Sequence, residues 1–181
     1  MKFYSPKKLS EYIRLFCLYG RAFPASEKKP ISIILRMAKR GKTDIWYFTE
    51  GKKFLGLAIT INSDDLRLID YFAVSEKQRG LGNGERMLRA LIEHYSDKGV
   101  FLEIEVPYEW ADNYTDRLRR RAFYTDKVGL APMGTTAKLF GVDMELLGHN
   151  CHLTYDQYRA FYLENYGSFA YDHITEADGK S

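Results

Sequence analysis

The feature that most constrains the fold is a change of hydrophobic period between residues 66 and 106. The segment "LRLIDYFAV" (66–74) has the composition of a strand, whereas the apolar residues of 84–97 recur at helical spacing. A third segment, "VFLEIEV" (100–106), reads as a strand that Pro107 ends. A strand, a helix and a strand in this order form a βαβ crossover. We therefore expect strands 66–74 and 100–106 to be parallel neighbours.

Two further apolar runs precede this unit. "DIWYFTE" (44–50) and "FLGLAITI" (54–61) are separated by a tight turn, so with strand 66–74 they predict an antiparallel meander. Helices are expected from Ser5 to Gly20, after Pro30 as far as Gly41, over 113–127 and over 154–167, and one or two closing strands over 137–147. The fold class is therefore α/β, with a mixed, mostly antiparallel sheet of six or seven strands flanked by helices.

Length and composition exclude several classes of protein. A chain of 181 residues fits one domain, which we expect over residues 1–171, followed by a polar, frayed tail over 172–181. The net charge of +3 is weak and the basic residues are scattered, so we expect no nucleic-acid partner. No segment has the length of a membrane span, and charged residues interrupt the apolar stretch near the start. With only two cysteines, a reducing, cytoplasmic location is expected.

The loop that joins strand 66–74 to the next helix is unusually rich in glycine. "EKQRGLGNGERML" (76–88) places three glycines within five positions, directly before a helix N-terminus. Unpaired backbone N–H groups and the helix dipole favour an anion there, and glycine lets a phosphate approach the main chain. The spacing fits neither the P-loop nor the Rossmann fingerprint. The loop therefore predicts an anion site of another kind, the alternative being a simple sharp turn.

The spacing that does fit is R-x-x-G-x-G, at residues 79–84. It resembles the acetyl-coenzyme A signature of the GNAT superfamily of N-acetyltransferases. "RAFYTDKVGL" (121–130) is similar to that family's F-Y-x-x-x-G-F segment, with a spacer one residue longer and Leu130 in place of the final Phe. The resemblance covers most of the chain. It implies a sheet that splays between strands 4 and 5, with acetyl-CoA as co-substrate.

The resemblance also implies roles for individual residues. Main-chain groups of strand 4 would receive the cofactor, and the glycine loop would bind its pyrophosphate; these residues are Phe72, Ala73, Val74, Arg79, Gly80, Leu81, Gly82, Asn83 and Gly84. Tyr124 matches the tyrosine that protonates the departing thiolate. Where the family often has Asn, this chain has Arg117, whose charge would meet a cofactor phosphate or else face solvent.

Strand 100–106 contains two candidates for the base that deprotonates the acceptor amine. Glu103 and Glu105 alternate with apolar residues, so both carboxylates lie on one face of a largely buried strand. A buried carboxylate needs a partner or a catalytic task. Either one acts as the base or orients the amine, or one or both pair with an arginine of helix 113–127. Asp70 is a weaker candidate, and deprotonation through water is a further alternative.

These features predict acetyl transfer from acetyl-CoA to a primary amine by direct attack in a ternary complex. The acceptor, a small molecule or a peptide, stays open, although Glu27, Asp70 and the strand carboxylates would favour a cation. The rival interpretation is a non-catalytic acyl-CoA-binding or sensing module. "HNCH" (149–152) has the wrong spacing for zinc, so no metal is expected. The oligomeric state is open, with a homodimer as one alternative.

Overall fold

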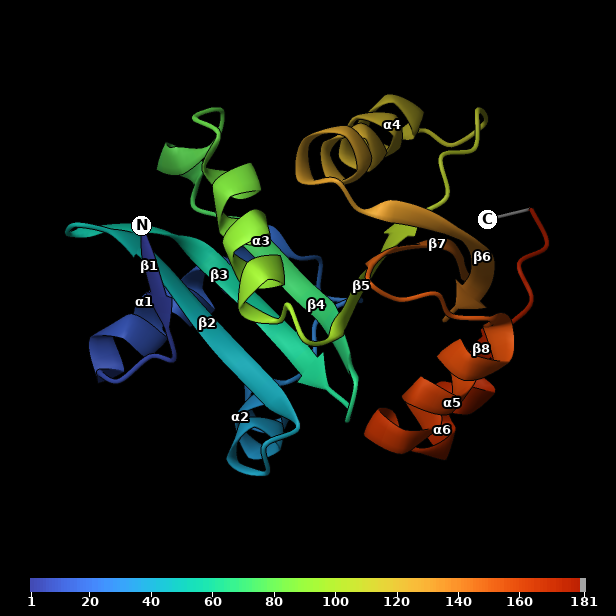
Figure 1. Ribbon diagram of the computed structural model, residues 1–181, viewed down its shortest axis with the longest axis horizontal. Coiled ribbons are helices and arrows are strands. Elements are labelled where there is room, and N and C mark those ends of the chain that lie inside the picture. The colour runs from blue at the N-terminus through green and yellow to red at the C-terminus, as the bar shows by residue number, and fades with distance from the viewer. Residues whose placement is uncertain (180–181) are drawn as a thin grey trace. The chain divides into compact units, whose positions relative to one another are not determined.

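The computed structural model describes residues 1–179 and has a mixed sheet flanked by helices (Figure 1). Its strands are β1 (Lys2–Tyr4), β2 (Thr43–Glu50), β3 (Lys53–Asn62), β4 (Leu66–Val74), β5 (Gly99–Glu105), β6 (Ala131–Leu139), β7 (Val142–His149) and β8 (Ile174–Thr175). Its helices are α1 (Leu9–Ala22), α2 (Ile31–Lys39), α3 (Asn83–His94), α4 (Tyr114–Ala122), α5 (Tyr155–Tyr166) and α6 (Ser168–Asp172), with a 3₁₀ turn η1 (Glu76–Gln78) and a π-helix η2 (Phe123–Val128).

The predicted fold class is confirmed. The strand order is β1-β2-β3-β4-β5-β7-β6-β8, and β4 pairs with β5 in parallel through Leu66–Leu68 and Gly99–Phe101, as the βαβ pattern requires. The described residues form eight strands rather than six or seven, because β1 and β8 also join the sheet. At three and two residues, both are too short to show an alternating pattern.

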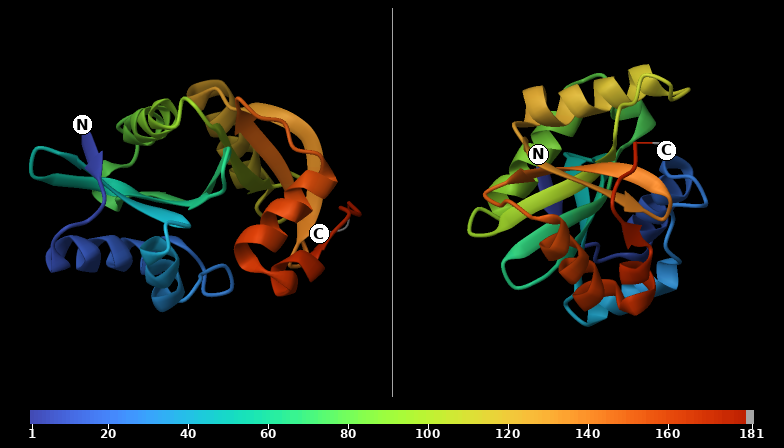
Figure 2. Two further views of the ribbon diagram at one scale, coloured as in Figure 1. Left: turned by 60° about the horizontal axis from the view of Figure 1, so that its bottom comes forward. Right: turned by 90° about the vertical axis from the view of Figure 1, so that its right-hand side faces the viewer.

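The chain divides into two compact units. Unit 1 comprises Met1–Asn62 and Ile69–Leu91, and within it α1 and α2 cover one face of the strands while α3 covers the other (Figure 2). Leu15, Tyr19 and Ile34 from these two helices pack against buried side chains of β2, β3 and β4. Gly56 of β3 is required here, since a Cβ at this position would lie 2.2 Å from the carbonyl oxygen of Ala73 in β4.

Unit 2 comprises Ser63–Leu68 and the chain from Ile92 onward. In it β5 pairs antiparallel with β7, and β7 pairs antiparallel with β6. β6 begins six residues before the expected strand 137–147, although this added part contains a proline and a glycine. The β6–β7 register shifts between Pro132 and Thr136. Such a bulge lets an interrupted segment stay in the ladder.

The first part of the expected tail is paired rather than frayed. Ile174 and Thr175 form β8 against the end of β6, and Lys138 of β6 pairs with Asp178. Residues 180–181 of the expected tail lie outside the described residues, and the division into a domain and a tail stays a prediction. In the described part of the chain, no helix is both long and apolar enough to cross a bilayer.

Candidate active site

The glycine loop lies between η1 and α3 in unit 1. Gly80 and Gly82 adopt left-handed backbone conformations, with φ of +74° and +72°, which L side chains rarely adopt. A Cβ built on either one would meet no protein atom within 4 Å, so the space above both is open. The first amides of α3 have no intrahelical acceptor, as at any helix start. The loop therefore offers backbone donors and room for a phosphate group.

Polar side chains fix the shape of this loop. Asn83, which is buried, donates from Nδ2 to the carbonyl oxygen of Gln78 at 3.2 Å and accepts from Arg86 Nη1 at 3.2 Å. Arg79 donates from Nε to the carbonyl oxygen of Val74 at 3.1 Å. Thus Asn83 and Arg79, predicted as cofactor ligands, hold the loop through their side chains. Leu81 is exposed, and Gly84 lies in the first turn of α3.

The end of β4 contains the predicted main-chain site. Ala73 is buried and the flanking Phe72 and Val74 are half-buried, as expected for one strand with two different faces. All three residues follow the last β4–β5 pair, which is Leu68 with Phe101. The β4 segment at 72–74 therefore lies beyond the parallel ladder.

Tyr124 lies in η2, the π-helix that continues α4 in unit 2. The backbone N–H of Gly129 bonds to the carbonyl oxygen of Tyr124, five residues back, and Gly129 has a φ of +90°. The longer spacer noted in the sequence is thus accommodated as a π-turn. Desolvation raises the pKa of the Tyr124 hydroxyl, and the nearby Arg120 partly opposes this effect. The phenol therefore stays protonated at neutral pH, which is the form a proton donor needs.

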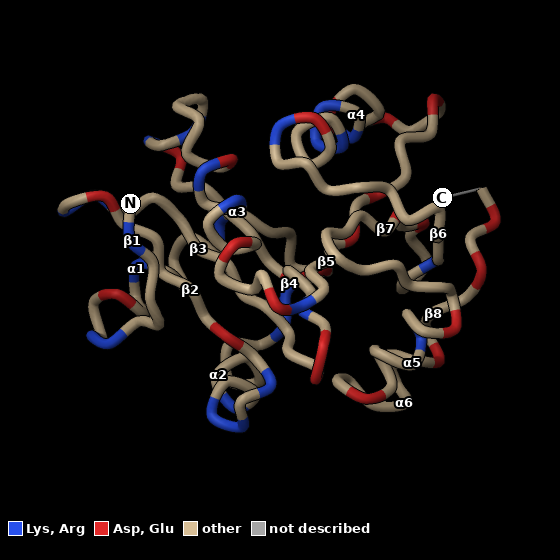
Figure 3. The backbone as a smooth tube through the Cα atoms, viewed as in Figure 1, with Lys and Arg blue, Asp and Glu red and all other residues tan. Residues whose placement is uncertain are grey.

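Glu105 is paired with arginines of α4. Its carboxylate lies 3.2 Å from Arg117 Nη2 and 3.2 Å from Arg120 Nη1, and Arg117 also donates to the carbonyl oxygen of Val106 at 2.8 Å. Figure 3 shows the concentration of basic residues on α4. The pairing expected as one alternative thus holds for Glu105. It also accounts for Arg117 within the fold, so the structure gives no support to a contact between Arg117 and a cofactor phosphate.

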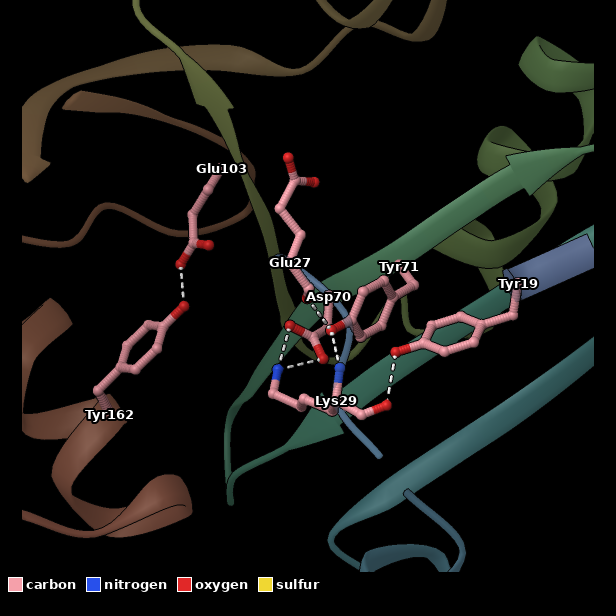
Figure 4. Close-up of polar contacts among 7 residues, drawn as sticks. All are labelled: Tyr19, Glu27, Lys29, Asp70, Tyr71, Glu103 and Tyr162. Atoms are coloured by element: carbon pink, nitrogen blue, oxygen red, sulfur yellow. Dashed lines mark hydrogen bonds and ion pairs between the residues drawn. The ribbon is translucent and has the colours of Figure 1, made fainter. Parts of the chain in front are cut away.

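Glu103 has a different environment on the same strand. It is half-buried, and its Oε1 accepts a hydrogen bond of 2.8 Å from the hydroxyl of Tyr162 in α5 (Figure 4). The Tyr162 side chain is itself buried. A tyrosine hydroxyl orients the carboxylate without adding a positive charge to it.

An ion pair at Asp70 was missed by the sequence analysis. Lys29 Nζ lies 2.7 and 2.6 Å from the two oxygens of Asp70, and 5.2 Å from the centre of the Tyr71 ring (Figure 4). Lys29 follows α1 in the connection to α2, 41 residues before Asp70. In the sequence, this ion pair is indicated only by two adjacent lysines in a polar connection. Asp70 is thus neutralised within unit 1, so its expected attraction for a cationic acceptor is reduced.

The remaining candidate groups have no arrangement that suggests chemistry. Within residues 1–179, no three His, Cys, Asp or Glu side chains are grouped to hold a metal ion. Cys17 and Cys151 are both free thiols. Burial raises the pKa of Cys151 to about 11, which makes it a poor nucleophile at neutral pH.

Residues 12–127 match the sequence profile of the acetyltransferase (GNAT) family. This match spans more than half of the chain, so the protein belongs to the GNAT family of acetyltransferases and is an acyltransferase. A comparison with curated proteins gave no match.

Solved structures share the fold. A protein from Bacteroides thetaiotaomicron assigned to the GNAT family superposes with a TM-score of 0.73 at 18% identity, over 93% of this chain and 99% of that chain. Spermidine N-acetyltransferase from Vibrio cholerae, in complex with CoA and spermine, gives a TM-score of 0.63 at 8% identity, over 82% and 94%. An aminoglycoside 6'-N-acetyltransferase complexed with coenzyme A gives 0.62 at 11%, over 82% and 96%.

Proposed function

We propose that this protein transfers an acetyl group from acetyl-CoA to a primary amine by direct attack in a ternary complex. The observation that carries the proposal is the glycine loop, in which Gly80 and Gly82 hold left-handed conformations below open space at the start of α3. A pyrophosphate needs backbone donors, a positive helix end and no Cβ in the way. The loop supplies all three. Related folds that bind CoA support the same assignment.

Acetyl-CoA supplies an activated thioester, and the residues of this chain then have separate tasks. The amine nitrogen attacks the thioester carbonyl, the C–N bond forms, the C–S bond breaks, and the thiolate takes up a proton. Main-chain N–H groups of β4 at residues 72–74 would stabilise the developing oxyanion. We propose that Tyr124 donates the proton that the thiolate takes up, because the raised pKa of Tyr124 keeps its hydroxyl protonated.

We assign the task of accepting the amine proton to Glu103 rather than Glu105. The guanidinium groups of Arg117 and Arg120 occupy the two oxygens of Glu105, which leaves little room for an amine beside them. At Glu103, the Tyr162 hydroxyl donates a hydrogen bond to Oε1 and fixes the direction of the carboxylate. An oriented carboxylate can act as the general base for the attacking amine.

The acceptor is a primary amine whose class the fold leaves open. Structures with the same fold include enzymes named for spermidine and for aminoglycosides. We further propose that residues 1–171 act as one acetyltransferase domain and that the protein works in the cytoplasm, where its two free cysteines stay reduced.

The test is an assay of CoA release with acetyl-CoA and a panel of primary amines: a polyamine, an aminoglycoside and a peptide with a free N-terminus. Transfer to at least one amine is expected, together with micromolar or tighter CoA binding by calorimetry. CoA binding without transfer to any amine would favour a non-catalytic acyl-CoA-binding module. Absence of both would overturn the proposal.

A further inference from the structure

Lys29 differs from an ordinary surface lysine because both its main chain and its side chain are fixed. Its backbone N–H donates to the Tyr71 hydroxyl at 3.1 Å, and its carbonyl oxygen accepts from the Tyr19 hydroxyl at 3.0 Å (Figure 4). The Tyr71 hydroxyl in turn donates to the carbonyl oxygen of Glu27 at 2.7 Å. Both tyrosine rings are buried. The connection between α1 and α2 is therefore anchored to the core of unit 1 at this residue.

Burial keeps these two tyrosines in their neutral form. Desolvation raises the pKa of Tyr71 far above its ordinary value, and the charge of Asp70 raises it further. Desolvation also raises the pKa of Tyr19. Neutral hydroxyls keep their hydrogen bonds over the whole physiological pH range, so the anchor of Lys29 does not depend on pH in that range.

The anchored side chain places its amine against β4. Both oxygens of Asp70 contact Lys29 Nζ, and the two side chains are only 9% and 28% exposed, respectively. Asp70 and Phe72 are two residues apart on one strand, so they share a face and lie about 7 Å apart. Phe72 begins the main-chain segment proposed to receive the acetyl thioester. A rotation of the lysine side chain away from Asp70 can therefore carry the amine toward this segment.

We propose that Lys29 is itself an acceptor, so that the protein acetylates its own Nζ at this position. This inference rests on the proposed function, which supplies acetyl-CoA. Asp70 accepts a proton from the Lys29 ammonium, and the free amine attacks the thioester carbonyl. The C–N bond forms, the C–S bond breaks, and the CoA thiolate leaves and takes up a proton. The product is a neutral amide at Lys29 and free CoA.

Acetylation at this position changes the charge of the acceptor region. A neutral amide cannot replace the ammonium in the ion pair, so the poorly exposed Asp70 loses its counter-charge. An unpaired carboxylate in such a site attracts another cation. The modified protein should therefore bind a cationic amine more tightly at Asp70 than the unmodified protein does.

Lys28 provides the internal control for the test. It is the adjacent residue in the same connection, and its Nζ donates to the carbonyl oxygen of Gly20 at 2.8 Å rather than to a carboxylate. Both lysines are half-buried. Chemical acetylation by acetyl-CoA without catalysis should affect the two to a similar extent, whereas the proposed reaction should select Lys29.

The experiment incubates the purified full-length protein with acetyl-CoA and quantifies acetylation of each lysine by peptide mass spectrometry. Lys29 should be labelled at least about tenfold faster than Lys28, and Asp70→Asn should lower the rate at Lys29 by about 10²-fold, the lower range for loss of a general base. In urea the two lysines should react at equal rates. In Lys29→Arg, which keeps a cation beside Asp70, the fast label should be absent.

Four outcomes would overturn the inference. Equal labelling of Lys28 and Lys29 in the folded protein would show a chemical background only. Unchanged labelling of Lys29 in Asp70→Asn would remove the assigned base. Turnover on the amine panel without label at Lys29 would overturn the inference while the proposed function stands. Absence of CoA binding and of any transfer would overturn both.

Discussion

The glycine loop allows a test in which backbone strain and ligand binding are separated. Gly51→Ala serves as the control for Gly82→Ala. Gly51 lies in the turn between β2 and β3 and has a φ of +58°, and a Cβ built on it likewise has no atom within 4 Å. Both substitutions force an L residue into the left-handed region, which costs roughly 1–2 kcal/mol. Neither creates a clash. Both variants should therefore lose about the same stability in urea unfolding.

Binding of CoA should separate the two variants. A methyl group at residue 82 projects into the open space where the pyrophosphate is proposed to lie, whereas Gly51 lies at a turn outside the loop. Loss of a single backbone hydrogen bond to a charged phosphate is worth about 1.5–3 kcal/mol. The Kd for CoA measured by calorimetry should therefore rise by about 10–150-fold in Gly82→Ala, and it should stay at the wild-type value in Gly51→Ala.

Two results would refute this reasoning. Wild-type affinity in Gly82→Ala, with the expected loss of stability, would mean that no phosphate approaches the loop. An equal loss of affinity in both variants would mean that binding follows global stability rather than contact at the loop. Measuring the unfolding free energy and Kd on the same preparations distinguishes these cases.

Three other predictions concern single side chains. Tyr124→Phe should keep CoA affinity and lower kcat and kcat/KM together by about 10²-fold, measured by CoA release; the loss should shrink for a thioester with a more acidic thiol. Glu103→Gln should slow transfer mainly at neutral pH, with recovery as pH rises, whereas Glu105→Gln should lower stability by about 1–2 kcal/mol and leave the pH profile unchanged. An alkylating reagent at pH 8 should label the exposed Cys17 first, and Cys151 only as the pH approaches about 11, since the thiolate is the reactive form; equal labelling at pH 8 would contradict its burial.

The sequence predicted the fold because the deciding patterns are local. The period change at 66–106, the glycines before α3 and the βαβ order each lie within a few tens of residues, and β4 was predicted with the bounds that the structure has. The strands at the sheet edges were missed, since their two or three residues pair through position rather than pattern. β6 was placed too late because Pro132 normally ends a strand, whereas here it precedes a bulge.

The sequence could not show which carboxylate is the best candidate for the general base, because most of their partners are distant along the chain. Asp70 pairs with Lys29 across 41 residues, and Glu103 bonds to Tyr162 across 59. Only Glu105 had a partner that the pattern could suggest, since Arg117 lies 12 residues away on the next helix. Alternation along a strand shows which face a side chain occupies. It contains no information about which distant side chain occupies the same space.

The longer spacer after Tyr124 is accommodated locally, within the helix that contains this tyrosine. In an α-helix an extra residue rotates everything that follows by about 100°, which would turn either Tyr124 or Gly129 away from its expected direction. η2 absorbs the residue as a π-turn, in which the Gly129 N–H reaches back to the Tyr124 carbonyl oxygen. Gly129 then ends the helix in the left-handed conformation. The added residue is therefore contained between the tyrosine and the helix end. The longer spacing is therefore compatible with the proton-donor role proposed for Tyr124.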